Sequence, residues 1–210
     1  MIWVLCNLLF SSALAPAAES KPRLLILGDS LTAGYGIPKA AAYPALLQAK
    51  IDQAKLGWIV ANGGRSGDTT RDGLTRLGWL LKKPADILMI ALGGNDGLRG
   101  VAPNAMKQNL TKIIAEARKK SPGIRIVIAG MQMPDNFGKD FQQKFQLVYG
   151  ELAKQEKATL IPFLLEGMAG DARYNLDDQI HPNEEGHKII AAHVWKTLES
   201  MFKARPVASE

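Results

Sequence analysis

The fold class of this chain is decided by the segment Asp86-Ile87-Leu88-Met89-Ile90-Ala91-Leu92-Gly93-Gly94-Asn95-Asp96. Asp86–Leu92 is an almost continuous apolar run, and a glycine pair closes it. A short run without polar alternation is typical of a strand that is buried on both faces. The segment therefore predicts a central strand of a parallel sheet that helices cover on both sides.

The same alternation of short apolar runs and amphipathic segments extends outward from this strand. Runs of similar character predict further strands at Leu24–Leu27, Trp58–Val60, Arg125–Ala129 and Thr159–Phe163. Apolar residues at helical spacing predict helices over Tyr43–Leu56, Thr70–Leu81, Met106–Ala117, Phe141–Leu152 and Ile189–Leu198. Such alternation predicts an α/β fold, and in these sheets ligands bind beyond the carboxyl ends of the strands.

Length and composition fit a single globular domain. The chain has 210 residues, of which 47% are hydrophobic and 22% are charged, a balance that excludes a disordered chain and a multi-span membrane protein. The formal net charge is +6. No arginine-rich run or interleaved aromatic stripe accompanies it, so we expect a scattered basic surface and no nucleic-acid partner.

The first residues have the pattern of a secretory signal. Ile2–Phe10 is nearly all apolar, and Ala15-Pro16-Ala17 fits a small-residue cleavage site, although no Lys or Arg precedes the apolar core. We predict a signal peptide over residues 1–18, a periplasmic or secreted domain over residues 19–210, and no stable membrane anchor. Cys6, the only cysteine, lies in this leader, so the mature chain would have no thiol.

Two segments could supply a nucleophile and its base. Ser30 follows the first predicted strand, where it is either a nucleophile or the N-cap of the next turn. Near the other end, Asp178 stands three residues before His181, a step that a helical turn would place on one face. A carboxylate on one ring nitrogen would orient the imidazole as a general base. The alternative is an ordinary surface loop before the last helix.

Two glycine-rich corners could supply donors for an oxyanion. Asn95 offers a side-chain amide after the central strand, and Gly67 offers an unobstructed backbone N–H after the second strand. Each corner taken alone is also compatible with a simple turn. The segments that follow the strands also contain candidate substrate-binding side chains, namely Leu98, Met131, Met133, Pro134 and Phe137.

Taken together, these blocks resemble the SGNH (GDSL-type) hydrolase family. The matching blocks are Gly28-Asp29-Ser30-Leu31, Ser66-Gly67-Asp68, Gly93-Gly94-Asn95-Asp96 and Asp178-Gln179-Ile180-His181-Pro182. Within the family they are closest to the bacterial periplasmic group of acyl-CoA thioesterases, lysophospholipases and arylesterases.

The resemblance implies a three-layer α/β/α, flavodoxin-like fold with a parallel five-stranded sheet of order 2-1-3-4-5. By the same resemblance, Ser30 is the nucleophile, His181 the base and Asp178 its orienter. The resemblance also implies an oxyanion hole formed by Ser30, Gly67 and Asn95. No metal or organic cofactor is needed.

We therefore predict a monomeric serine esterase that forms an acyl-enzyme intermediate. Its expected partners are small-molecule acyl esters, thioesters or lysophospholipids. Two alternatives stay open: a carbohydrate O-acetyl esterase that uses the same site, and a noncatalytic flavodoxin-like ligand-binding module.

Overall fold

The structure is a computed structural model that describes residues 21–204, apart from the side chain of Asp135. Its centre is a parallel sheet of order β2-β1-β3-β4-β5. The strands are β1 (Arg23–Gly28), β2 (Ile59–Gly64), β3 (Ile87–Ala91), β4 (Arg125–Ala129) and β5 (Thr159–Ile161). All four neighbouring pairs are parallel. The expected flavodoxin-like strand order is confirmed.

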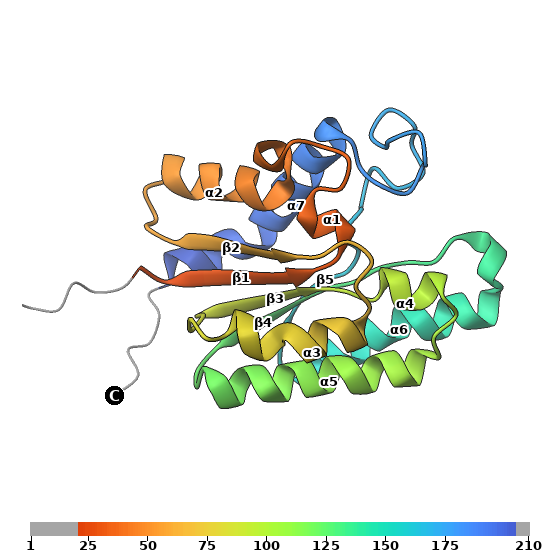
Figure 1. Ribbon diagram of the computed structural model, residues 1–210, viewed down its shortest axis with the longest axis horizontal. Coiled ribbons are helices and arrows are strands. Elements are labelled where there is room, and N and C mark those ends of the chain that lie inside the picture. Colours follow the sequence, from red (N-terminus) through yellow and green to blue (C-terminus); the bar gives the residue numbers. More distant parts are fainter. Residues whose placement is uncertain (1–20, 205–210) are drawn as a thin grey trace, which may run out of the picture.

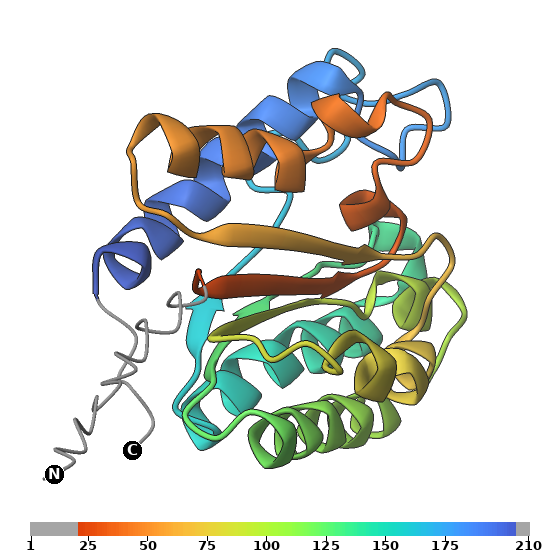
Figure 2. The same ribbon diagram turned by 60° about the vertical axis from the view of Figure 1, so that its left-hand side comes forward.

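Helices cover both faces of this sheet (Figures 1 and 2). One face carries α2 (Tyr43–Gln53) and α7 (Glu184–Lys203), which pack against each other. The other face carries α3 (Thr70–Leu80), α5 (Pro103–Lys120) and α6 (Lys139–Gln155). The shorter helices are α1 (Ser30–Ala33), η1 (Lys39–Ala41), α4 (Gly94–Leu98) and η2 (Asp135–Phe137).

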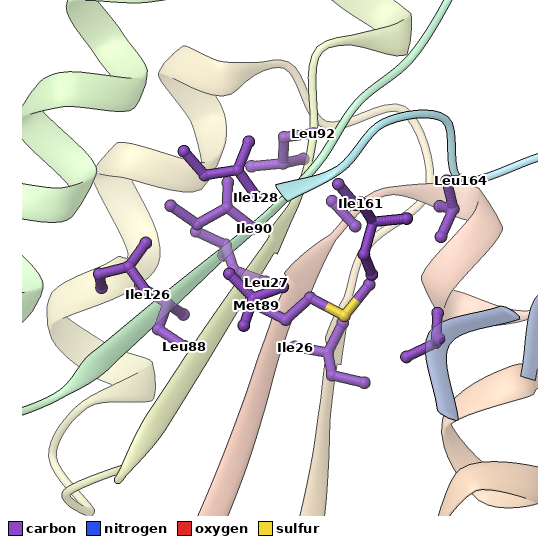
Figure 3. Packing of buried hydrophobic residues seen from close by; sticks show 14 of the residues in the cluster. Ile26, Leu27, Leu88, Met89, Ile90, Leu92, Ile126, Ile128, Ile161 and Leu164 are labelled. Atoms are coloured by element: carbon purple, nitrogen blue, oxygen red, sulfur yellow. The ribbon is translucent and has the colours of Figure 1, made fainter. Parts of the chain in front are cut away.

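The central strand explains why its sequence is apolar without alternation. All five residues of β3 are buried. Figure 3 shows Leu88 and Ile90 on one side of the strand and Met89 on the other, so each face of the sheet has its own packed layer. The helices on each face exclude water from these side chains, and this burial is the main favourable contribution to folding.

Strand β2 runs further than its sequence predicts. We expected it over Trp58–Val60, but Asn62, Gly63 and Gly64 also pair in register with Ile26, Leu27 and Gly28 of β1. The glycines are there because neighbouring backbone lies close. A Cβ on Gly63 would sit 2.7 Å from the Ile26 carbonyl oxygen, and one on Gly64 would sit 2.3 Å from the Ala33 nitrogen.

Other element ends also differ from expectation. Helix α2 ends at Gln53 rather than Leu56, because Lys55 adopts a left-handed conformation with φ of 53°. Strand β5 ends at Ile161, before Pro162, which has no N–H to donate to a ladder.

The predicted signal peptide, residues 1–18, lies outside the described residues. Within residues 21–204, no helix is both long and apolar enough to cross a bilayer.

Candidate active site

Ser30 is the first residue of α1, directly beyond the carboxyl end of β1. The N-cap of α1 is Asp29, whose Oδ1 accepts a hydrogen bond from the Leu31 N–H at 3.0 Å. The alternative interpretation of Ser30 as the N-cap is therefore wrong, because the preceding carboxylate takes that role. The Ser30 hydroxyl instead contacts His181, with 2.9 Å between Oγ and Nε2.

Asp178 and His181 meet in a turn rather than in a helix. The expected helical turn is wrong, because Gln179 between them adopts a left-handed conformation with φ of 58°. The turn lets the Asp178 Oδ1 accept hydrogen bonds from the N–H groups of Ile180 and His181, both at 2.9 Å. The other oxygen, Oδ2, lies 2.6 Å from the His181 Nδ1.

These contacts keep the Asp178 carboxylate charged. The backbone N–H of His181 and then its imidazole lower the pKa of Asp178 to about 2. An ionised Asp178 can hold the imidazole tautomer that carries a proton on Nδ1, which leaves Nε2 free to accept the Ser30 proton. The ring of Tyr35 lies against His181, with centroids 4.5 Å apart.

The two predicted oxyanion donors belong to adjoining segments. Asn95 lies in α4, and its Nδ2 donates to the Asp68 carbonyl at 3.0 Å and approaches the Asp29 Oδ2 at 3.4 Å. Gly67, with φ of 83°, precedes Asp68, and its carbonyl accepts from the Arg99 Nη2 at 3.0 Å. Within residues 21–204, the N–H of Gly67 donates no hydrogen bond, so it is available to a ligand.

Asp29 contributes a second carboxylate to this edge of the sheet. It is 3% exposed, and burial raises its pKa to about 6 although the Leu31 N–H opposes the shift. Sequence reasoning assigned this residue no role. Its position immediately before the candidate nucleophile was the available signal.

A cavity of about 660 Å³ opens beside Ser30 and His181. Four of the five predicted substrate-binding residues line this cavity, namely Leu98, Met131, Met133 and Pro134. Phe137 stacks on Phe141 instead, at 6.1 Å between centroids, and does not line the cavity. Gly67 is also absent from the lining.

Sequence reasoning missed a second wall of the cavity. This wall follows β5 and continues toward His181, and it consists of Phe163, Leu165, Ala169, Gly170, Asn175, Gln179 and Ile180. The position of its first residues beyond the carboxyl end of a strand was the signal that could have identified them.

Comparison with known proteins agrees with this architecture. Residues 26–189 match the GDSL-like Lipase/Acylhydrolase family. Esterase TesA of Pseudomonas aeruginosa is 40% identical over 85% of this chain and 89% of its own length. Arylesterase of Vibrio mimicus is 37% identical over 92% of this chain and 96% of its own length.

A third relative and a solved structure extend the comparison. Thioesterase 1/protease 1/lysophospholipase L1 of Escherichia coli K12 is 38% identical over 92% of this chain and 91% of its own length. The crystal structure of TesA superposes with a TM-score of 0.81 at 38% identity, over 85% of this chain and 99% of that one. On this evidence the chain belongs to the GDSL-like lipase/acylhydrolase family of ester-hydrolysing enzymes.

Proposed function

We propose that this chain is a serine esterase that hydrolyses carboxylic esters and thioesters through an acyl-enzyme intermediate, with Ser30, His181 and Asp178 as its catalytic residues. The observation that carries the proposal is the relay of 2.9 Å from the Ser30 Oγ to the His181 Nε2 and 2.6 Å from the His181 Nδ1 to the Asp178 Oδ2. A serine hydroxyl needs such an adjacent base, because it is hardly ionised at neutral pH.

In the first half-reaction, the Ser30 Oγ attacks the acyl carbonyl carbon while the His181 Nε2 takes the hydroxyl proton. The tetrahedral oxyanion accepts hydrogen bonds from the N–H groups of Ser30 and Gly67 and from the Asn95 amide, which rotates away from its 3.4 Å contact with Asp29. The bond to the leaving oxygen or sulfur then breaks, and His181 gives the proton to that atom.

In the second half-reaction, water takes the place of the leaving group. His181 accepts a proton from this water as its oxygen attacks the acyl-Ser30 carbonyl. Collapse of the second tetrahedral intermediate releases the carboxylic acid and returns the proton to the Ser30 Oγ. Asp178 stays ionised throughout and stabilises the imidazolium that forms in each half-reaction.

The cavity favours the interpretation that the enzyme distinguishes its substrates by their acyl chain. Its walls are mostly apolar, and its volume of about 660 Å³ is in the usual range for small-molecule sites. We assign Leu98, Met131, Met133 and Pro134 to the acyl wall, and the Phe137 N–H donates to the Pro134 carbonyl at 3.2 Å. Esters of small alcohols or phenols, acyl thioesters and lysophospholipids fit this site, in agreement with the names of the relatives.

The decisive experiment compares wild-type protein with Ser30→Ala in the hydrolysis of p-nitrophenyl octanoate. We expect kcat/KM to fall by about three orders of magnitude or more, with circular dichroism unchanged. Ser200→Ala, on the exposed side of α7, is the matched control and should keep the wild-type rate. Equal rates for Ser30→Ala and wild type would refute the assignment.

Two further measurements separate the alternatives. A fluorophosphonate should label the wild type and not Ser30→Ala, whereas a noncatalytic module would label neither. In a p-nitrophenyl series, each methylene buried in the cavity is worth about 0.8 kcal/mol, so kcat/KM should rise about fourfold per carbon from acetyl to medium chains. An O-acetyl esterase would instead prefer acetylated sugars and lose activity with chain length.

We also propose that residues 1–18 direct export, that the mature enzyme is periplasmic or secreted, and that it is a monomer. The apolar run and the small-residue cleavage pattern support the leader. N-terminal sequencing of exported protein should begin at Ala18 or Glu19. Light scattering of that protein should give the mass of one chain, and a cytoplasmic, uncleaved product would contradict the export proposal.

A further inference from the structure

A buried ion pair lies directly behind the candidate active site. Arg76, in α3, contacts Asp68 through its Nε, and its Nη2 donates to the Gly28 carbonyl at 2.9 Å. The Asp68 side chain is 2% exposed and that of Arg76 is 15% exposed. Removing two charges from water is costly unless other hydrogen bonds help to offset the cost, and here the Gly28 carbonyl and Arg65 supply such partners.

Both groups held by Arg76 belong to segments that carry candidate catalytic atoms. Gly28 is the last residue of β1, two residues before Ser30. Asp68 follows Gly67, and its carbonyl accepts the hydrogen bond from the Asn95 amide at 3.0 Å. One guanidinium therefore connects the strand that precedes the nucleophile to the loop that carries Gly67 and contacts Asn95. Figure 1 shows that this loop runs from the end of β2 into α3.

We propose that Arg76 is a positioning residue that sets the spacing between Ser30 and the oxyanion donors Gly67 and Asn95. This inference rests on the proposed esterase function and adds to it a residue outside the cavity. An arginine suits the role because its planar fork can donate to a carboxylate and a carbonyl at once, whereas a lysine presents a single ammonium.

The other cation on Asp68 cannot replace it. The side chain of Arg65 contacts the Asp68 Oδ1 at 2.6 Å, but it is 63% exposed and joins two residues of the same loop. Its contact with β1 is through its backbone N–H, which donates to the Gly28 carbonyl at 3.1 Å. Of the two arginines that contact the Asp68 carboxylate within residues 21–204, only Arg76 links this loop to β1 through a largely buried side chain.

The test uses Arg76→Lys and Arg76→Met, with Arg118→Met as the matched control. Arg118 also pairs with a carboxylate, that of Glu156, but far from the site in sequence and on the surface. Because a misplacement of about 1 Å can reduce catalysis about 100-fold, we expect kcat on p-nitrophenyl octanoate to fall about 10- to 100-fold in both Arg76 variants. KM should stay within about twofold, and Arg118→Met should match wild type.

A second readout is specific to the oxyanion. This readout compares p-nitrophenyl octanoate with its thiono ester, in which sulfur replaces the carbonyl oxygen. Sulfur accepts hydrogen bonds weakly. Correctly placed donors therefore favour the oxygen ester, so the ratio of oxo to thiono rates should fall in the Arg76 variants. Simple loss of stability would lower both rates together and leave the ratio unchanged.

A double variant, Asp68→Asn with Arg76→Met, keeps the test decisive if Arg76→Met does not fold, because it leaves no unpaired buried charge behind. We expect it to fold and to keep a low kcat. A wild-type kcat or oxo-to-thiono ratio in Arg76→Lys or in the double variant would overturn the inference. Full activity of Ser30→Ala would overturn the proposed function instead, so the two failures are distinguishable.

Discussion

Two aspartates at the same edge of the sheet have opposite pKa shifts. Asp178 accepts two backbone N–H groups and the His181 imidazole, and its pKa falls to about 2. Asp29 accepts the Leu31 N–H, but burial dominates and raises its pKa to about 6. The first carboxylate is held charged beside the His181 imidazole, while the second destabilises the folded protein when it ionises.

Replacing Asp29 by Asn should therefore stabilise the protein at neutral pH. A folded-state pKa raised from 3.8 to about 6 means that the contribution of Asp29 to stability is full below pH 3.8 and is lost as pH rises through 6. We expect Asp29→Asn to raise the free energy of unfolding by about 1 to 3 kcal/mol at pH 7. An Asn side chain can still cap α1.

Urea titrations at pH 7 and pH 4 check this prediction. The gain should disappear at pH 4, where Asp29 of the wild type is protonated. Asp177→Asn, on the exposed surface beside Asp178, should change stability little at either pH. A loss of stability at pH 7 in Asp29→Asn would show that the hydrogen bonds of the carboxylate outweigh its burial.

For single residues, the sequence predicted which side chains pair better than it predicted the backbone geometry that brings them together. The three-residue step correctly paired Asp178 with His181, but the left-handed Gln179 that forms the turn has no strong signal, because non-glycine residues rarely adopt that conformation. The contact between Ser30 and His181 spans 151 positions and was expected only through the family resemblance. Arg76 lies in a segment with an amphipathic helix pattern, where a single arginine is expected to be a solvated side chain.

The charged residues at the ends of two long helices suit the helix dipole. Helix α5 ends with Arg118, Lys119 and Lys120, and cations there interact favourably with the helix dipole. Helix α7 begins with Glu184 and Glu185, which suit the opposite end.

Substitution of two glycines by alanine should have opposite effects on the stability of the protein. Gly64→Ala would place a Cβ 2.3 Å from the Ala33 nitrogen, and backbone cannot move aside as a flexible side chain can. We expect a loss of about 1 to 3 kcal/mol or more, as in other overpacked cores. In Gly150→Ala the Cβ would meet nothing within 4 Å, so helix propensity should stabilise α6 by about 1 kcal/mol.

Thermal and urea unfolding of both glycine variants measure the difference. Because Ala33 ends the helix that Ser30 begins, Gly64→Ala should also lower kcat. Gly150→Ala should keep wild-type activity. If the two variants were equally stable, the close approach of β2 to α1 would not constrain the fold.

The contact between α2 and α7 includes a buried histidine. The Tyr43 N–H, at the start of α2, donates to the His187 Nδ1 at 3.1 Å, and His187 is 1% exposed. Burial lowers the pKa of His187 to about 4. The contribution of the neutral ring to stability is therefore present above pH 6.5 and is lost as pH falls through 4.

We expect this histidine to make α2–α7 docking sensitive to acid. In His187→Asn the side-chain oxygen can accept from the Tyr43 N–H without gaining a proton. The variant should be less stable than wild type at pH 7, and the difference in unfolding free energy should shrink by about 3 kcal/mol or less on going to pH 4. His193→Asn, on the same helix, is the control. A constant difference across this range would contradict the prediction.

For the whole molecule, the sequence predicted layers and strand positions because those depend on the period and length of apolar runs. The expected strands at Leu24–Leu27, Asp86–Leu92 and Arg125–Ala129 all fall on observed strands. The cavity was less predictable. Its second wall, from Phe163 to Ile180, is an irregular connection, and the contacts that shape such a segment come from tertiary packing rather than from a repeating pattern.

The arrangement of the core predicts a single cooperative transition for the whole domain. The central strand contributes Met89 to one packed layer and Leu88 to the other, so neither layer can separate without exposing the strand that both share. Loss of secondary structure by far-ultraviolet circular dichroism and loss of fluorescence from the buried Trp58 should therefore coincide in urea. The active-site segments follow the strands and are anchored by Arg76 and Asp178, so esterase activity should be lost in the same transition. Activity that disappears at lower urea than the two spectroscopic signals would instead show that the site opens locally while the sheet stays folded.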